Sequence, residues 1–494
     1  MTQQTAAAPE HFDVLIVGAG ISGIDAAYHL TQHRPGTRFA ILESQAALGG
    51  TWHTHTFPGI RSDSDLFTFG FSWKPWTGLP IAQASDILAY LQDAVSENDL
   101  EDKIRFGCNV EAAQWSSADS RWTLTLRAGP DHPAVTMTCG FLWMCAGYYR
   151  HSEGFTPDWP GMDRFEGPIV HPQTWPDTLD HAGKEVIVIG SGATAATLVP
   201  ALTRTTKRVT MIQRSPTFYF PRPMMDEFSE TLSALGLPDE WYHEIMRRKF
   251  LHENELTARR AREEPDALAQ DLMDGAKAYL GDEIDFDTHF KPTYRAWRQR
   301  IAMVPDGDLF VALRDGAAEI VTDTIAQFVP EGVQLSSGQH VRGDIIVTAT
   351  GLNLNMFGDI DLAVDGQAVD IPSLYTHRGA MFSDLPNFVT VFGYLRSSWT
   401  LRADLLSSYV CRLLDHMDAK GAASVTPRLR AEDQDMQERP WVDPENFNPG
   451  YLMRSLGQLP RQGDKQPWIM TQDYYQDRDD LPVADLDDGT LIYQ

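Results

Sequence analysis

The pattern of apolar and polar positions predicts two strand–helix–strand units in one chain. Residues 12–17 form a short, nearly continuous apolar run, which is typical of a strand buried in a parallel sheet. The run ends at the glycine-rich turn 18–23, after which apolar residues recur at helical spacing up to Leu30. Residues 39–42 are apolar again, so residues 12–42 predict a βαβ unit.

The same order recurs about one domain length later in the chain. An apolar run over residues 185–189 leads into a second glycine-rich turn at 190–195, a helix carrying Leu198 and Leu202, and a strand over 209–212. Two such units predict an α/β fold with two Rossmann-like dinucleotide-binding domains.

The remaining segments differ from these two units in composition and in their pattern of apolar residues. Residues 217–292 are charged and helix-prone, so we expect a helical insertion there. Residues 345–351 and 388–392 predict further buried strands. Residues 1–11 predict a disordered tail, and the residues after about 420 predict an irregular wrap over the surface.

Composition and charge narrow the classes of partner. With 43% hydrophobic and 22% charged residues the composition is that of a globular protein, and 494 residues predict two or three domains. The net charge of −27 argues against a nucleic-acid partner, whose phosphates would be repelled. We find neither an apolar run of membrane-spanning length nor the features of a signal peptide, so we expect no integral membrane segment. The four cysteines form no CxxC pair and no metal-ligand cluster, which predicts no metal site and a cytoplasmic location.

Glycine-rich turns of this kind bind the pyrophosphate of a dinucleotide. Glycine allows the tight bend, the close approach of the backbone to the phosphates and the packing of helix on strand, and the helix N-terminus attracts the negative charge. In the second turn alanine replaces the third glycine, which is a tolerated variant. The predicted contacts are Gly18, Gly20 and Gly23 in the first turn, and Gly190, Ser191, Gly192, Ala193, Thr194 and Ala195 in the second.

The residue at the end of each unit's second strand indicates which dinucleotide that unit binds. Glu43 ends the second strand of the first unit, where a carboxylate can accept hydrogen bonds from a ribose 2′-hydroxyl. The comparable position of the second unit carries Arg214 followed by Ser215, and a guanidinium there suits a 2′-phosphate. We therefore predict FAD at the first turn and NADPH at the second.

These assignments define the predicted domain organisation. The FAD-binding domain comprises residues 1–150 and returns, with the C-terminal wrap, over 341–494. The NADPH-binding domain comprises residues 151–216 and 293–340, on either side of the helical insertion at 217–292.

The segment between the two turns carries a more specific motif. Residues 165–176, FEGPIVHPQTWP, fit the pattern FxGxxxHxxxWP, the fingerprint of type I Baeyer–Villiger monooxygenases, which the chain resembles. Residues 50–63 fit the second pattern of that family, GxWxxxxFPGxxxD, and Ala349-Thr350-Gly351 is similar to a late ATG segment of flavin monooxygenases. The chain looks most like the ethionamide-activating branch, which handles ketones and also oxidises sulfur compounds.

The resemblance implies a reaction and the residues that perform it. NADPH would reduce FAD, the reduced flavin would capture dioxygen as a C4a-peroxide, and the peroxide anion would add to a ketone and yield an ester or lactone. The family places an arginine that stabilises this anion shortly after the helical insertion, which aligns with Arg300, and Asp63 aligns with its carboxylate partner. His171 of the fingerprint is expected in a hinge between domains, with a conformational role.

The resemblance also implies further cofactor contacts. Those for FAD are Ser22, Gly50, Thr51, Trp52 and the main chain near Val110, and those for NADPH are Arg61, Ser62 and Asp63. Many relatives carry a lysine directly before the arginine, in contact with the 2′-phosphate, whereas this chain has Gln299. Either Arg214 with Ser215 suffices, or Arg298 helps, or the selectivity for NADPH is weaker.

Other functions remain open from the sequence. A flavin-dependent N- or S-oxygenase shares both nucleotide turns but prefers soft nucleophiles to ketones. A disulfide reductase would need a redox cysteine pair, which the sequence does not offer, and a catalytically silent flavin sensor would leave Asp63 and Arg300 without a purpose. The substrate, the regiochemistry and the oligomeric state have no motif that predicts them.

Overall fold

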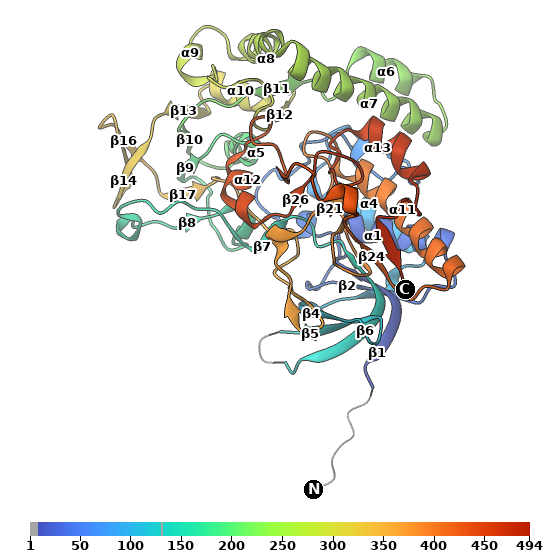
Figure 1. Cartoon of the computed structure of the whole chain (residues 1–494). Helices are drawn as coiled ribbons and strands as arrows, with labels where there is room; N and C mark the ends of the chain where they lie inside the picture. Colours follow the sequence, from blue (N-terminus) through green and yellow to red (C-terminus); the bar gives the residue numbers. More distant parts are fainter. Residues whose placement is uncertain (1–7, 130–131) are drawn as a thin grey trace.

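The computed structural model describes residues 8–129 and 132–494 (Figure 1). Most of the tail predicted over residues 1–11 therefore lies outside the described residues. The first strand, β1, spans Glu10–Val17, so it begins before the predicted end of the tail. His11 and Thr138 explain this, because their side chains are hydrogen-bonded and Glu10–Phe12 pair with Met137–Cys139 of the neighbouring strand.

The first sheet is built around β1. Its strand order is β20-β19-β4-β5-β6-β1-β2-β3, and β23 also pairs with β6. The pairs of β1 with β2 and β6 are parallel, and β4, β5 and β6 form an antiparallel meander. The strands are β2 (Phe39–Leu42), β3 (Ile104–Arg105), β4 (Asn109–Ser116), β5 (Arg121–Arg127), β6 (Val135–Met144), β19 (Asp361–Val364), β20 (Gln367–Ala368) and β23 (Phe388–Thr390).

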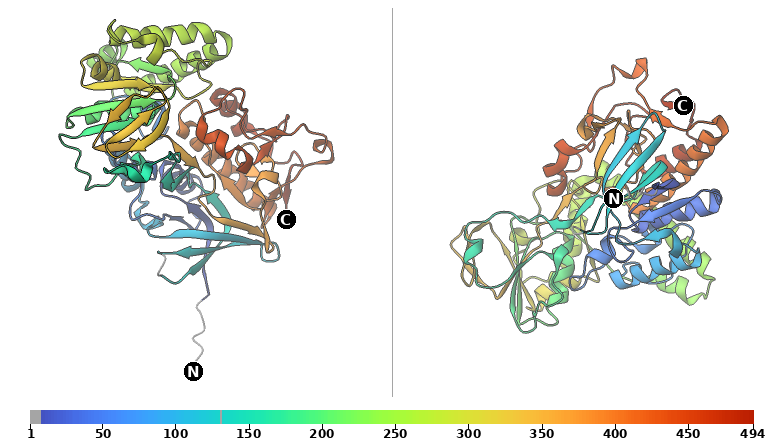
Figure 2. Two further views of the ribbon diagram at one scale, coloured as in Figure 1. Left: turned by 90° about the vertical axis from the view of Figure 1, so that its left-hand side faces the viewer. Right: turned by 90° about the horizontal axis from the view of Figure 1, so that it is seen from below.

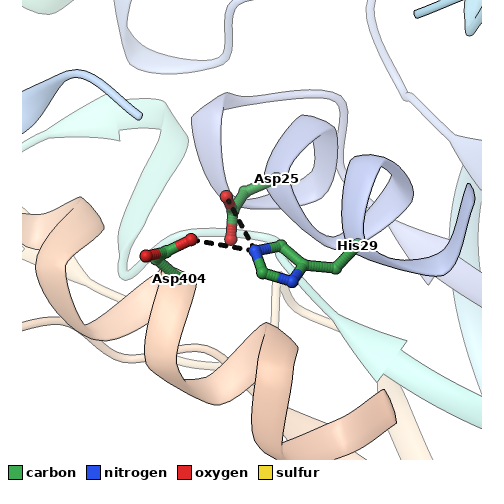
Figure 3. Close-up of side chains that lie close together, drawn as sticks. All are labelled: Asp25, His29 and Asp404. Carbon is green, nitrogen blue, oxygen red and sulfur yellow. Dashed lines mark hydrogen bonds and ion pairs between the residues drawn. The ribbon is translucent and has the colours of Figure 1, made fainter. Parts of the chain in front are cut away.

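Two helices cover the parallel part of this sheet. Helix α1 (Ile21–His33) follows the first glycine turn and packs against α11 (Trp399–Lys420), from the far end of the chain. Figure 3 shows His29 of α1 between Asp25 of the same helix and Asp404 of α11. His29 Nε2 lies 2.8 Å from Asp404 Oδ1 and 3.8 Å from Asp25 Oδ1. The cluster links two helices that are distant in sequence.

The second sheet is entirely parallel, with the order β13-β10-β9-β17-β8. Its strands are β8 (Ile169–Val170), β9 (Glu185–Ile189), β10 (Arg208–Gln213), β13 (Ala318–Thr322) and β17 (Ile345–Thr348), and it is accompanied by the helices α5 (Ala193–Leu202) and α10 (Asp308–Arg314). The sequence predicts that the chain returns to the FAD-binding domain at residue 341. Strand β17 lies after this position but belongs to the second sheet, so the second domain extends further than predicted. The apolar run of β17 predicts a buried strand but cannot reveal which sheet it joins.

The region predicted as a helical insertion, 217–292, contains four helices preceded by a strand. The helices are α6 (Glu227–Ala234), α7 (Asp239–Glu263), α8 (Pro265–Leu280) and α9 (Phe286–His289). Strand β11 (Tyr219–Arg222) pairs in parallel with β12 (Ala302–Pro305), so the insertion leaves and re-enters the second domain at adjacent strands. Figure 2 shows the helices, in green, above the second sheet.

Helix α7 also reaches the first domain. It contacts the short helix α3 (Leu66–Phe69), where Phe250 stacks on Phe67 with ring centroids 5.6 Å apart. Arg247 is buried and donates a hydrogen bond of 2.7 Å to the carbonyl oxygen of Phe67. The insertion therefore binds the two domains together beside the segment that carries Asp63.

The chain crosses between the domains at a pair of strands. They are β7 (Tyr149–Gly154) and β18 (Leu352–Leu354), which pair antiparallel. The other elements include the hairpin strands β14 (Ile325–Val329), β15 (Gly332–Leu335) and β16 (His340–Arg342), and the helices α2 (Thr51–Thr54) and α4 (Ala84–Glu97). No helix among the described residues is long and apolar enough to span a membrane.

The C-terminal region is more deeply packed than a surface wrap. It contains β24 (Val425–Pro427), α12 (Gly450–Ser455), α13 (Tyr474–Asp480) and β27 (Leu491–Tyr493), joined by irregular segments. Trp441 and Trp468 are nevertheless almost fully buried. The Pro- and Asp-rich composition predicts the irregular backbone but gives no sign of these anchoring tryptophans.

Candidate active site

One cavity of about 1570 Å³ reaches both glycine turns. Its wall includes Gly18 and Glu43 of the first unit and Gly190 and Arg214 of the second, together with Arg300. Cavities that hold one small ligand measure roughly 300–1,000 Å³. The size and the two turns together fit a site that accommodates more than one ligand.

The first turn has the geometry that a dinucleotide needs. Gly18 has φ +104°, and a Cβ there would lie 2.5 Å from the carbonyl oxygen of Cys145. A Cβ at Gly23 would lie 1.9 Å from the carbonyl oxygen of Gly18, so glycine is required at both positions for packing alone. Gly20 differs, because its Cβ would come no closer than 3.7 Å to any protein atom. Its open side faces the cavity, where the amides of Ile21 and Ser22 at the start of α1 lack a main-chain acceptor in the described chain and can bind phosphate.

Glu43 is buried at the edge of the cavity and is held by main-chain amides. Its Oε2 accepts a hydrogen bond of 2.7 Å from the amide of Ala19, and its Oε1 accepts one of 2.9 Å from the amide of Gln45. A carboxylate has about four acceptor sites, so further sites remain for ribose hydroxyls. The donor set and the open glycine turn fit FAD.

The other predicted FAD contacts also line the cavity. Gly50, Thr51, Trp52 and Val110 form part of its wall. Ser22 lies on the wall as well, and its Oγ accepts a hydrogen bond of 2.8 Å from Nε1 of Trp399. The Ser22 hydroxyl keeps its own hydrogen to donate.

The second turn repeats this arrangement with one difference. Gly190 has φ +130°, and a Cβ there would lie 2.2 Å from the carbonyl oxygen of Ala349, whereas a Cβ at Gly192 would meet no protein atom within 4 Å. Ala195 is completely buried in the core of the second domain and does not form part of the wall, so its methyl group serves packing. The open side of Gly192 fits a second pyrophosphate. Ser191, Ala193 and Thr194 are further wall residues at this turn.

Arg214 and Ser215 are exposed on the cavity wall directly after β10. Arg214 forms no ion pair with any residue of the described chain, so its guanidinium is free to bind a phosphate. Gln299 lies on the wall, whereas Arg298 is not among the described wall residues. This placement supports Arg214 with Ser215, rather than Arg298, as the site of a 2′-phosphate.

The segment 61–63 places its three side chains in different environments. Arg61 lies on the wall but forms a two-point ion pair with Asp308, at 2.6 and 3.2 Å, which joins the two domains. Ser62 is buried and donates to the carbonyl oxygen of Ser64, and it is not among the described wall residues. Asp63 faces the cavity.

Asp63 pairs with Arg300 across the cavity wall. Arg300 Nη1 lies 3.2 Å from Asp63 Oδ2, and their side chains are 32% and 38% exposed. Burial, the largest single effect, would lower the pKa of Arg300, but Asp63 and the three neighbouring tyrosines Tyr148, Tyr149 and Tyr451 together outweigh it and hold the pKa well above its ordinary value. The arginine therefore provides a permanent positive charge in the cavity.

Neighbouring structure fixes this pair from both sides. The amide of Ser62 donates to the carbonyl oxygen of Ala82 at 2.9 Å, which anchors the loop that carries Asp63. Arg300 lies two residues before β12 and follows a turn in which Trp297 adopts φ +64°. The carbonyl oxygen of Arg298 accepts a hydrogen bond of 2.8 Å from the amide of Asn448, in the C-terminal region.

His171 lies at the domain crossing and outside the described cavity wall. Its Nε2 is 3.0 Å from the carbonyl oxygen of Gly351, and its Nδ1 accepts from the amide of Gln173. A Cβ at Gly154 would lie 2.0 Å from the imidazole, so the ring packs directly on strand β7. Burial lowers the pKa of His171, which keeps it neutral and fits a conformational role.

Three tyrosines on the wall were not identified from the sequence. Tyr148 and Tyr149 follow the end of β6, and Tyr451 lies in α12. Ligands commonly bind at the carboxyl ends of parallel strands, so the position after β6 could have indicated the first two. Tyr451 lies in the C-terminal region, and no pattern in the sequence marks it.

The described residues contain one group of side chains close enough to hold a metal, namely Asp25, His29 and Asp404 (Figure 3). Asp25 already accepts hydrogen bonds from Trp73 Nε1 and Ser407 Oγ, one on each carboxylate oxygen. These contacts fit a packing cluster. Cys108, Cys139, Cys145 and Cys411 are all free thiols, and the last three are buried.

Comparison with known proteins places the chain in a family. Residues 12–247 match the family model for pyridine nucleotide-disulphide oxidoreductases. The FAD-containing monooxygenase EthA of Mycolicibacterium smegmatis is 43% identical over 98% of this chain and 97% of its own length. EthA of Mycobacterium tuberculosis is 43% identical over 98% of both chains, and the putative FAD-containing monooxygenase MymA of that species is 41% identical over 98% of both.

Solved structures show the same fold. An oxidized steroid monooxygenase bound to NADP superposes with a TM-score of 0.69 at 22% identity and covers 85% of this chain and 88% of its own. A cyclohexanone monooxygenase from Rhodococcus sp. Phi1 bound to NADP+ gives 0.70 at 21% identity over 86% and 88%. With relatives at 41% and 43% identity over nearly their full length, the chain belongs to the FAD-containing monooxygenases that include EthA and MymA.

Proposed function

We propose that the chain is an NADPH-dependent flavin monooxygenase that inserts one oxygen atom of O₂ beside a ketone carbonyl, and that it also oxidises sulfides. The observation that supports this most directly is the single cavity that joins both glycine turns and contains the ion pair of Arg300 with Asp63. The overall reaction converts ketone, O₂, NADPH and a proton into ester or lactone, NADP⁺ and water.

The first turn and Glu43 would hold FAD, and the second turn with Arg214 and Ser215 would hold NADPH. When bound, NADPH supplies the hydride and the reduced flavin supplies the activation of dioxygen. The two-sided cavity would bring these cofactors to a common space, while the glycine turns set the position of each pyrophosphate.

Arg300 would stabilise negative charge on the oxygen species during transfer. Its guanidinium remains protonated at any working pH, and Asp63 orients it by the 3.2 Å contact. A charge fixed in place before the reaction needs no reorganisation when negative charge develops, which is the main advantage of such a site over water.

The aromatic wall would limit the access of water to this charge. Trp52, Tyr148 and Trp399 line the cavity, and the rings of Tyr148 and Trp399 stack with centroids 4.8 Å apart. Exclusion of water strengthens the field of Arg300 and suppresses release of hydrogen peroxide.

The decisive experiment is NADPH consumption by the FAD-loaded enzyme over a panel of ketones and sulfides, with product identification and a peroxide assay. We expect esters or lactones from ketones and sulfoxides from sulfides, with NADPH consumption matched to product. Oxygenation of sulfides and amines without any ester would establish the alternative, an N- or S-oxygenase. NADPH consumption that yields hydrogen peroxide alone would contradict both functions.

A further inference from the structure

Tyr148, Tyr149 and Tyr451 form a cluster on the same cavity wall as Arg300. The rings of Tyr148 and Tyr149 have centroids 3.9 Å apart. The rings of Tyr149 and Tyr451 pack edge to face, with centroids 5.7 Å apart. Tyr149 is the first residue of β7 and Tyr148 directly precedes it, whereas Tyr451 lies in α12, so the cluster joins segments about 300 residues apart.

The hydroxyl groups of this cluster are incompletely paired. Tyr148 donates to the Oη of Tyr149 at 2.7 Å, which leaves the hydrogen of Tyr149 without an acceptor in the described chain. The Oη of Tyr451 is buried and has no hydrogen-bond partner among the described residues. A buried hydroxyl without a partner costs about 1–3 kcal/mol, so Tyr451, beside the unused hydrogen of Tyr149, indicates an acceptor that a ligand provides.

The surroundings hold both hydroxyls in position. Tyr148 stacks on Trp399, whose Nε1 donates to Ser22 in the first turn of α1, so the pair of tyrosines is connected to the predicted flavin site. Helix α12, which carries Tyr451, is anchored by Arg454, which donates to the carbonyl oxygen of Leu352 at 3.1 Å. The donors therefore do not depend on mobile side chains.

The Tyr149 hydroxyl also keeps its hydrogen. Burial raises the pKa of Tyr149 well above its ordinary value, and the opposing effect of the Arg300 charge is smaller. At neutral pH the Tyr149 hydroxyl is a donor and not a phenolate. A protonated donor beside a permanent cation is suited to an oxygen atom that becomes negative during a reaction.

We propose that Tyr149 and Tyr451 donate hydrogen bonds to the carbonyl oxygen of the bound ketone. This inference rests on the proposed function. When the oxygen nucleophile bonds to the carbonyl carbon, the π pair of the carbonyl moves onto its oxygen, and the two hydroxyls stabilise this charge. As a carbon substituent then migrates to oxygen and the O–O bond breaks, the pair returns to form the C=O bond of the ester.

Sulfide oxidation makes no comparable demand on these hydroxyls. The sulfur lone pair attacks the distal oxygen, the O–O bond breaks, and the negative charge remains on the departing oxygen. The substrate has no carbonyl oxygen that gains charge, so Tyr149 and Tyr451 serve ketones specifically. The two substrate classes thus separate a catalytic role of the hydroxyls from a structural one.

The test uses Tyr149→Phe and Tyr451→Phe in the full-length, FAD-loaded enzyme. Each change removes one oxygen atom and keeps the ring. We expect kcat/KM for a ketone to fall at least about tenfold in each variant, since loss of one such donor has cost roughly 10²–10³ in other enzymes. Sulfide oxidation and anaerobic reduction of FAD by NADPH should stay within about threefold of the wild-type rates.

Tyr375→Phe is the matched control, because Tyr375 lies outside the described cavity wall and its hydroxyl makes no hydrogen bond in the described chain. Equal loss of ketone and sulfide activity would overturn the proposal, and so would unchanged ketone turnover in both variants. A wild-type enzyme that reduces FAD with NADPH but converts no ketone contradicts the proposed function itself, before any variant is made.

Discussion

Arg300 Nη1 lies 3.2 Å from Asp63 Oδ2, although 237 positions separate the two residues in the sequence. Asp63 belongs to a loop of the first domain, and Arg300 to the segment that returns from the helical insertion. Since α7 of the insertion also packs on α3, a few residues after Asp63, the contact between the domains sets the geometry of this pair. A change in the arrangement of the domains would therefore alter the distance between Arg300 and Asp63.

Arg300→Ala should separate flavin reduction from oxygen transfer. The variant keeps both glycine turns, so we expect it to bind FAD and to be reduced by NADPH at near wild-type rate. Ester formation should fall by about 10² or more and hydrogen peroxide should replace it, because the fixed positive charge is lost. The measurement is product and peroxide per NADPH consumed. Arg298→Ala removes a nearby arginine outside the described wall and is the control. Undiminished lactone formation in Arg300→Ala would show that the assigned role is wrong.

Gly20→Ala and Gly192→Ala form a reciprocal pair that tests the cofactor assignment. The backbone at both positions has negative φ, −78° and −75°, and the added methyl group would meet no protein atom closer than 3.7 Å. Folding should be unaffected, and any loss must come from contact with a ligand. We expect Gly20→Ala to lose FAD and Gly192→Ala to raise KM for NADPH at least about tenfold while it retains FAD. The reverse outcome would exchange the two assignments.

Arg214→Ala tests recognition of the 2′-phosphate. A charge-assisted hydrogen bond contributes about 1.5–3 kcal/mol, so KM for NADPH should rise roughly 10- to 100-fold while KM for NADH changes little. The measurement is the ratio of kcat/KM for the two cofactors. Arg204→Ala makes the same charge change at an exposed residue outside the described wall and should leave this ratio unchanged. Equal effects of Arg214→Ala on both cofactors would remove the argument for a phosphate contact.

The structure shows which features a sequence can predict. The two turns were predictable because the demands on Gly18 and Gly190 are local: each has positive φ, and each would clash with a carbonyl oxygen if it carried a Cβ. The membership of β17 in the second sheet was not, because strand pairing depends on residues far away in sequence.

At the site, too, the local motif was predictable from the sequence, whereas the partners of its side chains were not. Arg61 and Ser62 are adjacent to Asp63 in the motif, yet one is paired with Asp308 and the other is buried. The motif specifies the loop but not the partner that each side chain finds. Tyr451 carries no motif at all, and it becomes a candidate only when α12 is seen against Tyr149.

The cluster of Asp25, His29 and Asp404 predicts a pH-dependent contribution to stability. Burial, with a further effect of the Asp404 charge, raises the pKa of Asp25 from 3.8 to about 6, while His29 opposes the shift. The folded protein therefore binds more protons at Asp25 than the unfolded chain does between about pH 4 and 6, and stability is lost as the pH rises through this window. The pKa of His29 is raised as well: burial acts against this, but the two carboxylates outweigh it. Its contribution is likewise lost at higher pH.

Asp25→Asn should remove the first of these effects. Asparagine has nearly the same shape and can still accept from Trp73 and donate to Ser407, so the packing between α1 and α11 is retained. We expect the Tm difference between variant and wild type to increase as the pH rises from 4 to 7, with the variant gaining roughly 1–3 °C over that range. Asp418→Asn is the matched control, because Asp418 is an exposed residue of α11 that pairs with Arg34 and lies outside the cluster of Asp25, His29 and Asp404. Parallel Tm curves for Asp25→Asn and wild type would mean that Asp25 keeps the same charge in the folded and unfolded states across this range.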